Sequence, residues 1–314
     1  MAKGVPYTNH HYVPQCLLKA FGHEIGNKRK KKQFFLYGYS LERRDGFKSN
    51  VSKCCQEDNY YRISQEAIKN NPNLKHKELE IESDFFSRQI ETELGIILDK
   101  IENHKQTCIK QNHPIFQISD EEKYDIARQL VYQFMRHPSN REQVLSFFDE
   151  SIPVMLQAMQ HMASKQLNNP KIEDLDIHIY RDKALTHANL SFFNDDLVHK
   201  YTTDLCGNIW NFLYSPERNI CTSDNPFVVY QQLPNERPLN QGLEQCGAVI
   251  FFAFSPDLLL VILDKDCLAN FVDCRFGTIT EKAMSLYNTA LCSQSTVVFN
   301  YNNNFDNIIT TIYG

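Results

Sequence analysis

The sequence lacks the short motifs that identify most common enzyme classes. It has no phosphate-binding P-loop, no GxGxxG placed after a predicted strand, no GxSxG and no HExxH. The usual nucleotide-binding folds, serine hydrolases and zinc proteases are therefore poor descriptions of this chain. Its chemistry has to be sought in less familiar groupings of polar residues.

Paired cysteines and long apolar runs are also missing. The ten cysteines form no CxxC pair, so a zinc site built from thiolates is poorly supported. No apolar run is long enough to span a bilayer, and the N-terminus has no apolar segment like that of a signal peptide. We therefore expect a cytoplasmic protein with reduced cysteines and no membrane partner.

Neither sign of charge is in great excess. The chain has 33 Lys and Arg against 38 Asp and Glu, a net charge of -5. This balance does not suggest a general binder of polyanions, although a local basic groove remains compatible with it. With 314 residues, of which 42% are hydrophobic, the chain is long enough to form a substantial core.

The hydrophobic patterns predict an α+β fold in which a helical middle section packs with a mostly antiparallel sheet formed by the N-terminal and C-terminal segments. We treat residues 1–314 as a single domain with three sub-regions: a motif and hairpin (1–63), a helical part (64–204) and a strand-rich part (205–314). Apolar residues recur at helical spacing in 79–101, 120–136 and 139–167. Strands are predicted at 177–180, 209–214, 227–230, 248–254, 258–263, 296–301 and 308–313. In the third helix, Val154, Met155, Ala158, Met159 and Met162 form a stripe typical of core.

The first polar motif is HHYVPQ, at residues 10–15. A proline restricts the residue before it to extended conformations, and side chains alternate in an extended segment. We expect one of His10 and His11 to face inward and the other outward. The inward histidine could donate or accept a proton, or bind a metal. The alternative is a buried histidine whose ring bonds a backbone carbonyl.

The second motif is QFMRHPSNR, at residues 133–141. Gln133 and Arg136 lie on a polar stripe of the predicted helix 120–136, and Arg141 follows within one turn after the proline. Two arginines at a helix junction can hold an anion such as a phosphate. The alternative is ordinary capping of the helix end by basic residues, with surface ion pairs.

The third motif is TSDNP, at residues 222–226, directly before the apolar run of a predicted strand. Ser223, Asp224 and Asn225 make a tight polar turn, and residues at strand ends often carry chemistry because the scaffold fixes them. The alternative is a turn in which Asp224 bonds only nearby backbone.

In this order and combination the three motifs resemble the bacterial domain-of-unknown-function family 4238, over about residues 8–300. The helix around Glu91 also looks like a family feature, and His137 stands where the family more often has threonine. The resemblance implies family membership and candidate positions, and it implies no particular reaction. It does favour a functional pocket over purely structural roles for these polar residues.

Two hypotheses follow. The first is a phosphodiester hydrolase, in particular a nuclease acting on nucleic acid or nucleotides, in which His10 or His11 acts as general acid or base. Arg136 and Arg141 would bind the phosphate. Asp224 would orient a histidine or hold a divalent metal ion as cofactor, with Glu91 as a second carboxylate. Further substrate-binding side chains would be Gln15, Gln133, Ser223 and Asn225. The second hypothesis is a non-catalytic sensor module that binds a nucleotide or anion through the same arginines and turn.

Both hypotheses require the three motifs to meet. We expect the side chain of His10 or His11, the Arg136 guanidinium and the Asp224 carboxylate to surround one cleft. A direct pair between Arg136 and Asp224 would favour a structural role, whereas a gap between them would favour hydrolysis.

Overall fold

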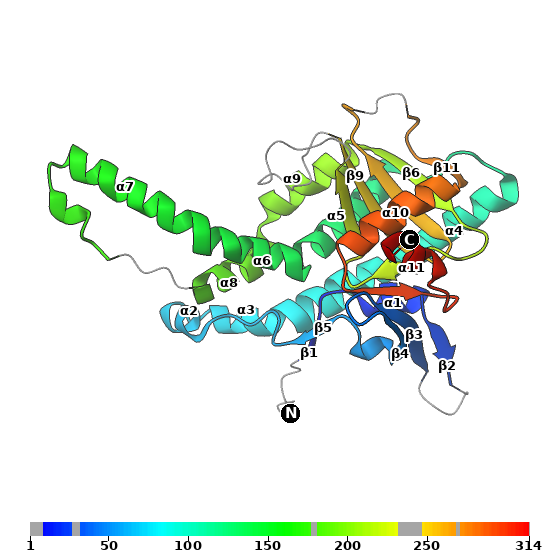
Figure 1. Cartoon of the computed structure of the whole chain (residues 1–314), viewed down its shortest axis with the longest axis horizontal. Helices are drawn as coiled ribbons and strands as arrows, with labels where there is room; N and C mark the ends of the chain where they lie inside the picture. The colour runs from blue at the N-terminus through cyan, green and yellow to red at the C-terminus, as the bar shows by residue number, and fades with distance from the viewer. Residues whose placement is uncertain (1–8, 27–31, 177–180, 232–246, 268–270, 314) are drawn as a thin grey trace.

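The computed structural model describes residues 9–26, 32–176, 181–231, 247–267 and 271–313 (Figure 1). The fold is α+β, with helices through the middle of the chain and antiparallel sheets built from its two ends, which confirms the predicted class. Of the described strand pairs only β11 with β6 is parallel. No helix among the described residues is both long and apolar enough to cross a membrane.

One of the two five-stranded sheets is mostly buried and comes entirely from the C-terminal third of the chain. Its strand order is β11-β6-β10-β9-β8. Every residue of β10 is buried, as expected for a central strand covered on both faces, and α10 crosses one face of this sheet (Figure 1). The strands predicted at 248–254 and 258–263 are confirmed, and they pair as the β9–β10 hairpin. The strands are β6 (Ile209–Tyr214), β8 (Phe227–Gln231), β9 (Ala248–Ser255), β10 (Leu258–Leu263) and β11 (Arg275–Thr278).

The second sheet joins the two ends of the chain. Strand β12 pairs antiparallel with β3, and β7 pairs with the other edge of β12. Strand β4 pairs with β3, where Gly38 lies opposite Phe47. A Cβ at Gly38 would lie 2.5 Å from the Phe47 ring, so glycine is required for this close approach. The strands are β2 (His23–Ile25), β3 (Gln33–Ser40), β4 (Asp45–Asn50), β7 (Thr222–Ser223) and β12 (Val297–Asn300). A separate ribbon pairs β1 (Asn9–His11) with β5 (Gln56–Asp58).

Helices fill the space between these sheets and extend beyond them. The predicted helix 79–101 is part of a continuous helical stretch from Leu74 to Gln111, and its middle is a π-helix, η2. The helix predicted at 120–136 begins with a capping box formed by Ser119 and Glu122. The helical segments are α1 (Gln15–Ala20), η1 (Val51–Lys53), α2 (Gln65–Asn70), α3 (Leu74–Glu80), η2 (Ile81–Ile90), α4 (Glu91–Gln111), α5 (Asp120–Met135), α6 (Pro138–Ser146), η3 (Phe147–Ser151), α7 (Ile152–Gln166), η4 (Pro170–Ile172), α8 (Arg181–Leu190), η5 (Ser191–Phe193), α9 (Asp195–Cys206), α10 (Glu281–Ser293) and α11 (Asp306–Tyr313).

Two expectations from the sequence are wrong, and a third falls outside the described residues. The predicted last strand, 308–313, is the helix α11, which packs against α10 with Ile308 buried. The apolar stripe predicted as core in 139–167 is exposed, because α7 points away from the body of the molecule (Figure 1). The predicted strand 177–180 lies outside the residues that the structure describes.

Candidate functional site

The first motif enters the core as an extended segment buried on both sides. His10 and His11 are 8% and 3% exposed, so the expectation that one of them faces outward is wrong. The ring of His10 stacks on Tyr61, and its Nδ1 accepts a hydrogen bond from the Tyr61 amide at 3.1 Å. The Tyr61 hydroxyl donates to the carbonyl of His11 at 3.1 Å. Tyr61 thus covers the His10 ring, whereas Glu57 and Asp58 of the paired strand β5 are exposed.

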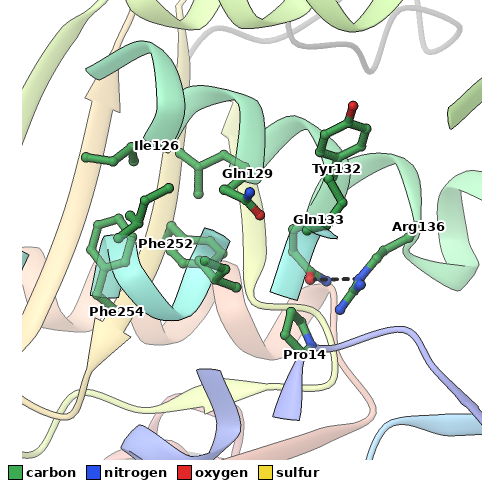
Figure 2. Close-up of a pocket in the computed structure, with 12 residues that line it drawn as sticks. Pro14, Ile126, Gln129, Tyr132, Gln133, Arg136, Phe252 and Phe254 are labelled. Atoms are coloured by element: carbon green, nitrogen blue, oxygen red, sulfur yellow. Dashed lines mark hydrogen bonds between the residues drawn. The ribbon is translucent and has the colours of Figure 1, made fainter. Parts of the chain in front are cut away.

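Arg136 connects the first motif to the second. It follows the last residue of α5 and is 1% exposed. Its Nε donates to the carbonyl of Tyr12 at 3.0 Å and to Gln133 Oε1 at 3.2 Å, the bond drawn in Figure 2. Gln133 Nε2 donates to the same Tyr12 carbonyl at 3.0 Å. These three bonds fix the guanidinium plane.

The two terminal nitrogens of Arg136 are left without hydrogen-bond partners in the described part of the chain. Nη2 lies 3.6 Å from Glu91 Oε1, an ion-pair distance beyond normal hydrogen-bond length. The guanidinium also lies over the Phe86 ring, with its carbon 4.9 Å from the ring centroid. A buried guanidinium with unfilled donors is unfavourable unless an acceptor completes it. The two nitrogens can therefore donate to an added acceptor oxygen, either of water or of an anion.

Two carboxyl groups, Glu82 and Glu91, share the surroundings of this arginine. Burial raises the pKa of Glu82 to about 7, against the opposing effect of Arg136, and the neighbouring Glu91 adds to the rise. Burial also raises the pKa of Glu91, while Arg136 lowers it. The Glu82 carboxyl has a hydrogen bond with the backbone of His11, but its Oε2 is buried without a partner among the described residues. Near neutral pH Glu82 is therefore about half protonated.

His11 and Gln15 lie on the edge of this cluster. The Nε2 atoms of the two side chains are 3.4 Å apart. Burial lowers the pKa of His11, and the charge of Arg136 adds to this effect. His11 is therefore a neutral hydrogen-bonding group near pH 7.

Asp224 is fully engaged in holding its own turn against β12. Its carboxylate accepts hydrogen bonds from the amide and hydroxyl of Thr296 and from the amide of Val297. Burial raises the pKa of Asp224, and the bonds from Thr296 oppose the rise. No ion pair between Asp224 and Arg136 is found among the described residues. The third motif approaches the second through His137, which hydrogen-bonds the backbone of Asp224.

The neighbours of Asp224 are also used within the turn. Ser223 Oγ donates to the carbonyl of Asn225 at 2.7 Å and accepts from its amide at 3.0 Å. Asn225 Nδ2 donates to the carbonyl of Gln294 at 3.3 Å. These bonds are the ones expected if the TSDNP turn has a structural role, in which its polar side chains bond nearby backbone.

Arg141 is displaced from Arg136 by a tyrosine. Its Nη1 donates to the carbonyl of Tyr60 at 2.9 Å, and its guanidinium lies 4.5 Å from the Tyr60 ring centroid. The Tyr60 hydroxyl in turn donates to the carbonyl of Arg136 at 3.0 Å. Arg141 thus supports the backbone of the site, and its guanidinium lies against Tyr60 and not beside Arg136.

The model of a protein family described as "Protein of unknown function (DUF4238)" matches residues 9–301, nearly the whole chain. The chain belongs to this family. Comparison with curated proteins and with solved structures finds no match. All three motifs lie within the matched residues, and so does the cluster around Arg136.

Two hollows adjoin the cluster in this DUF4238 protein. A small cavity of about 10 Å³, the space of one water molecule, is lined by Pro14, Gln133 and Arg136 on one side and by Phe252 and Phe254 on the other (Figure 2). A larger surface cleft of about 440 Å³ lies between α1, α4 and the β9–β10 hairpin. Phe254 lines both hollows, whereas Arg136 lines only the small cavity.

The cleft also borders the backbone of Glu91. Cys16 lines the cleft, and its thiol donates to the Glu91 carbonyl at 3.7 Å. The Glu91 side chain is 19% exposed, so it is the cluster's contact with solvent. Within the described residues, no three His, Cys, Asp or Glu side chains are grouped so that they could hold a metal ion.

The sequence did not single out Glu82, which is the most perturbed carboxyl of the cluster. It stands in an acidic stretch, ESD at 82–84, that looks like an ordinary solvated helix face. Glu82 lies nine residues before Glu91, and in an α-helix this spacing places two side chains on opposite sides. The sequence therefore gave no reason to group the two carboxyls. Only the π-helical geometry of η2 brings them together.

Proposed function

We propose that this DUF4238 protein is a phosphodiester hydrolase, in the first instance a nuclease, whose reaction centre is formed by Arg136, Glu82 and Glu91. The observation that supports this proposal is the pair of unfilled, buried nitrogens of Arg136 beside a carboxyl group with a pKa of about 7. A phosphoryl group offers two oxygens that match such a guanidinium edge. A carboxylic acid that is half protonated near pH 7 is suited to proton transfer.

In this reaction Arg136 binds the two non-bridging oxygens of the phosphate and stabilises the charge that grows on them. A water oxygen attacks phosphorus, and the bond from phosphorus to the leaving oxygen breaks. Protonated Glu82 gives its proton to that leaving oxygen, and the attacking water loses its proton to Glu91. Proton exchange with solvent through the partly exposed Glu91 then restores the starting state.

The histidines have a different role from the one expected from the sequence. His10 Nδ1 is already an acceptor for the Tyr61 amide, and His11 is neutral and close to Gln15. We assign them to positioning, because the backbone of His11 hydrogen-bonds Glu82. The 440 Å³ cleft is within the size range of small-molecule sites, and a nucleotide unit held there would reach Arg136 once the Phe254 side chain moves aside. The cytoplasm, where thiols stay reduced, is the compartment that we propose.

The test is to incubate the protein with RNA, DNA and nucleotides, with and without divalent metal ions. We expect hydrolysis by the unsubstituted chain and its loss in Glu82→Gln and Arg136→Lys, since lysine keeps the charge but loses the two-pronged donor. Arg128→Lys is the matched control, because Arg128 is on the same helix and pairs with the surface residue Glu93. Hydrolysis unaffected by Glu82→Gln would contradict the proposal.

The second candidate is a non-catalytic module that binds a nucleotide or an anion through Arg136. The same unfilled nitrogens support it, since an anion needs donors and no proton transfer. It predicts saturable nucleotide or phosphate binding with no turnover. Binding would be lost in Arg136→Lys and retained in Glu82→Gln, which separates this candidate from the hydrolase.

A further inference from the structure

The segment from α6 to η4, residues 138–172, forms an arm whose outer part is the helix α7 (Figure 1). One face of α7 is covered by the chain that follows it. Gln160 Nε2 donates to the carbonyls of Ile172 and Leu175 at 3.3 and 2.6 Å. His161 Nδ1 lies 3.2 Å from Glu173 Oε1. The arm therefore has its own internal contacts along this polar face.

Another face of α7 is apolar and has no cover among the described residues. We call it the α7 stripe. Its larger side chains keep 52–64% of their surface exposed, and Ala158 lies exposed among them. An amphipathic pattern normally faces a core, and a contiguous exposed apolar patch marks an interaction site. The α7 stripe consists of Val154, Met155, Ala158, Met159 and Met162.

We propose that the α7 stripe binds the same stripe of a second copy of this chain, as an antiparallel pair of helices with its twofold axis near Ala158. Contact between identical patches is the usual arrangement of twofold dimers. The small Ala158 side chain on the axis allows the two helices to approach closely. Val154 would then lie opposite Met162 of the partner subunit, and methionine adapts well to such contacts.

The charges along the arm select this occupant and this direction. No Lys, Arg, Asp or Glu occurs from residue 151 to 164, whereas Asp149 and Glu150 stand before this stretch and Lys165 after it. The midpoint between Glu150 and Lys165 falls beside Ala158. In an antiparallel pair each Glu150 therefore approaches Lys165 of the partner subunit, while a parallel pair would bring like charges together. Antiparallel helix dipoles add a favourable contribution.

The first test compares the mass of the full chain in solution by sedimentation over a range of concentrations. We expect a dimer for the unsubstituted chain and at least about tenfold weaker association for Met159→Glu, which places a charge in the apolar contact. The matched control is Ile96→Glu, at a residue that is 56% exposed on α4. A chain that is monomeric at every concentration, or equal effects of the two variants, would overturn the proposal.

The second test exchanges the charges. Glu150→Lys and Lys165→Glu should each weaken the dimer, because each places like charges at both ends of the pair. The double variant should recover dimerisation, since it restores opposite charges. No recovery in a double variant that keeps its helical circular dichroism would contradict the antiparallel arrangement.

The third test uses oxidative cross-linking. Ala158→Cys should form a disulfide-linked dimer, because the two introduced thiols meet on the axis. Leu167→Cys should not exceed the background of the unsubstituted chain, since its two copies would be roughly 27 Å apart at 1.5 Å per residue. Cross-linking at 167 instead of 158 would overturn the axis position. These tests do not depend on the reaction proposed for Arg136.

Discussion

Glu82 gives the most direct test of the electrostatics in the buried cluster. Its pKa in the folded chain is about 7, against 4.5 for an ordinary glutamate, because burial disfavours the charged form. The folded state therefore holds the proton more tightly than the unfolded state does. The contribution of Glu82 to the free energy of unfolding is therefore fully present below pH 4.5, and it is lost as the pH rises through 7.

The size of the effect follows from the two pKa values. The full difference corresponds to about 3 kcal/mol of unfolding free energy, of which about 2 kcal/mol is lost between pH 5.5 and pH 8. Glu82→Gln keeps the shape and removes the titration. We expect the stability of this variant, relative to the unsubstituted chain, to increase by about 2 kcal/mol over that pH interval.

Urea unfolding at pH 5.5 and pH 8 measures this difference. Glu42→Gln, in the exposed turn after β3, makes the same chemical change and should show no such increase. If the Glu82→Gln increase is absent, Glu82 is charged at pH 8 without penalty and the reasoning about its burial fails. The same titration should set the upper pH limit of any hydrolysis, because the acid form is the proton donor.

Three further predictions concern the surrounding residues. Arg136→Met should destabilise the fold by about 3–5 kcal/mol in urea unfolding, because it removes one hydrogen bond to the Tyr12 carbonyl and leaves the buried Glu91 without its ion-pair partner. Thr296→Val should reduce stability by about 1–3 kcal/mol in the same assay, since it removes a hydroxyl that donates to the buried Asp224. His137→Asn should reduce acid sensitivity. Burial lowers the pKa of His137 to about 4 from 6.5, so stability is present above pH 6.5 and lost as the pH falls through 4, by up to about 3 kcal/mol. Unfolding midpoints measured between pH 7 and pH 4 should show a smaller loss in this variant.

The regular elements could be predicted where local pattern and tertiary packing agree. Helix α5 has an amphipathic stripe and a capping box, and both signals lie within 17 residues of sequence, from Ser119 to Met135. The β9–β10 hairpin likewise combines two apolar runs with a Ser255–Asp257 turn. Such signals need no knowledge of distant residues.

Local pattern fails where packing decides. Residues 308–313 are rich in β-branched side chains, which favour strands, yet they form α11 because Ile308 and Ile312 lie on one helical face against the core. The α7 stripe has the periodicity of a core helix, but periodicity gives no information on which molecule covers the face. Asp224 shows the same limit for sites, since turn chemistry selects Ser, Asp and Asn whether or not they bind a ligand.

The cluster around Arg136 shows how helix geometry determines what sequence reading can find. At 100° per residue, the nine steps from Glu82 to Glu91 amount to two and a half turns of an α-helix, which would place the two carboxyls on opposite faces. A π-helix has roughly 4.4 residues per turn, so the same nine steps make about two full turns and return to the same face. The structure has the π-helix η2 over Ile81–Ile90. Both carboxyls lie close enough to Tyr61, beside Arg136, to contribute to the rise in its pKa. Phe86, four residues after Glu82, also meets the guanidinium. The π-helix is rare in proteins, and it occurs frequently at functional sites. An apolar α-helix would pack the same space without burying charge, so the π-helical stretch is the feature of this cluster that the proposed hydrolase would account for.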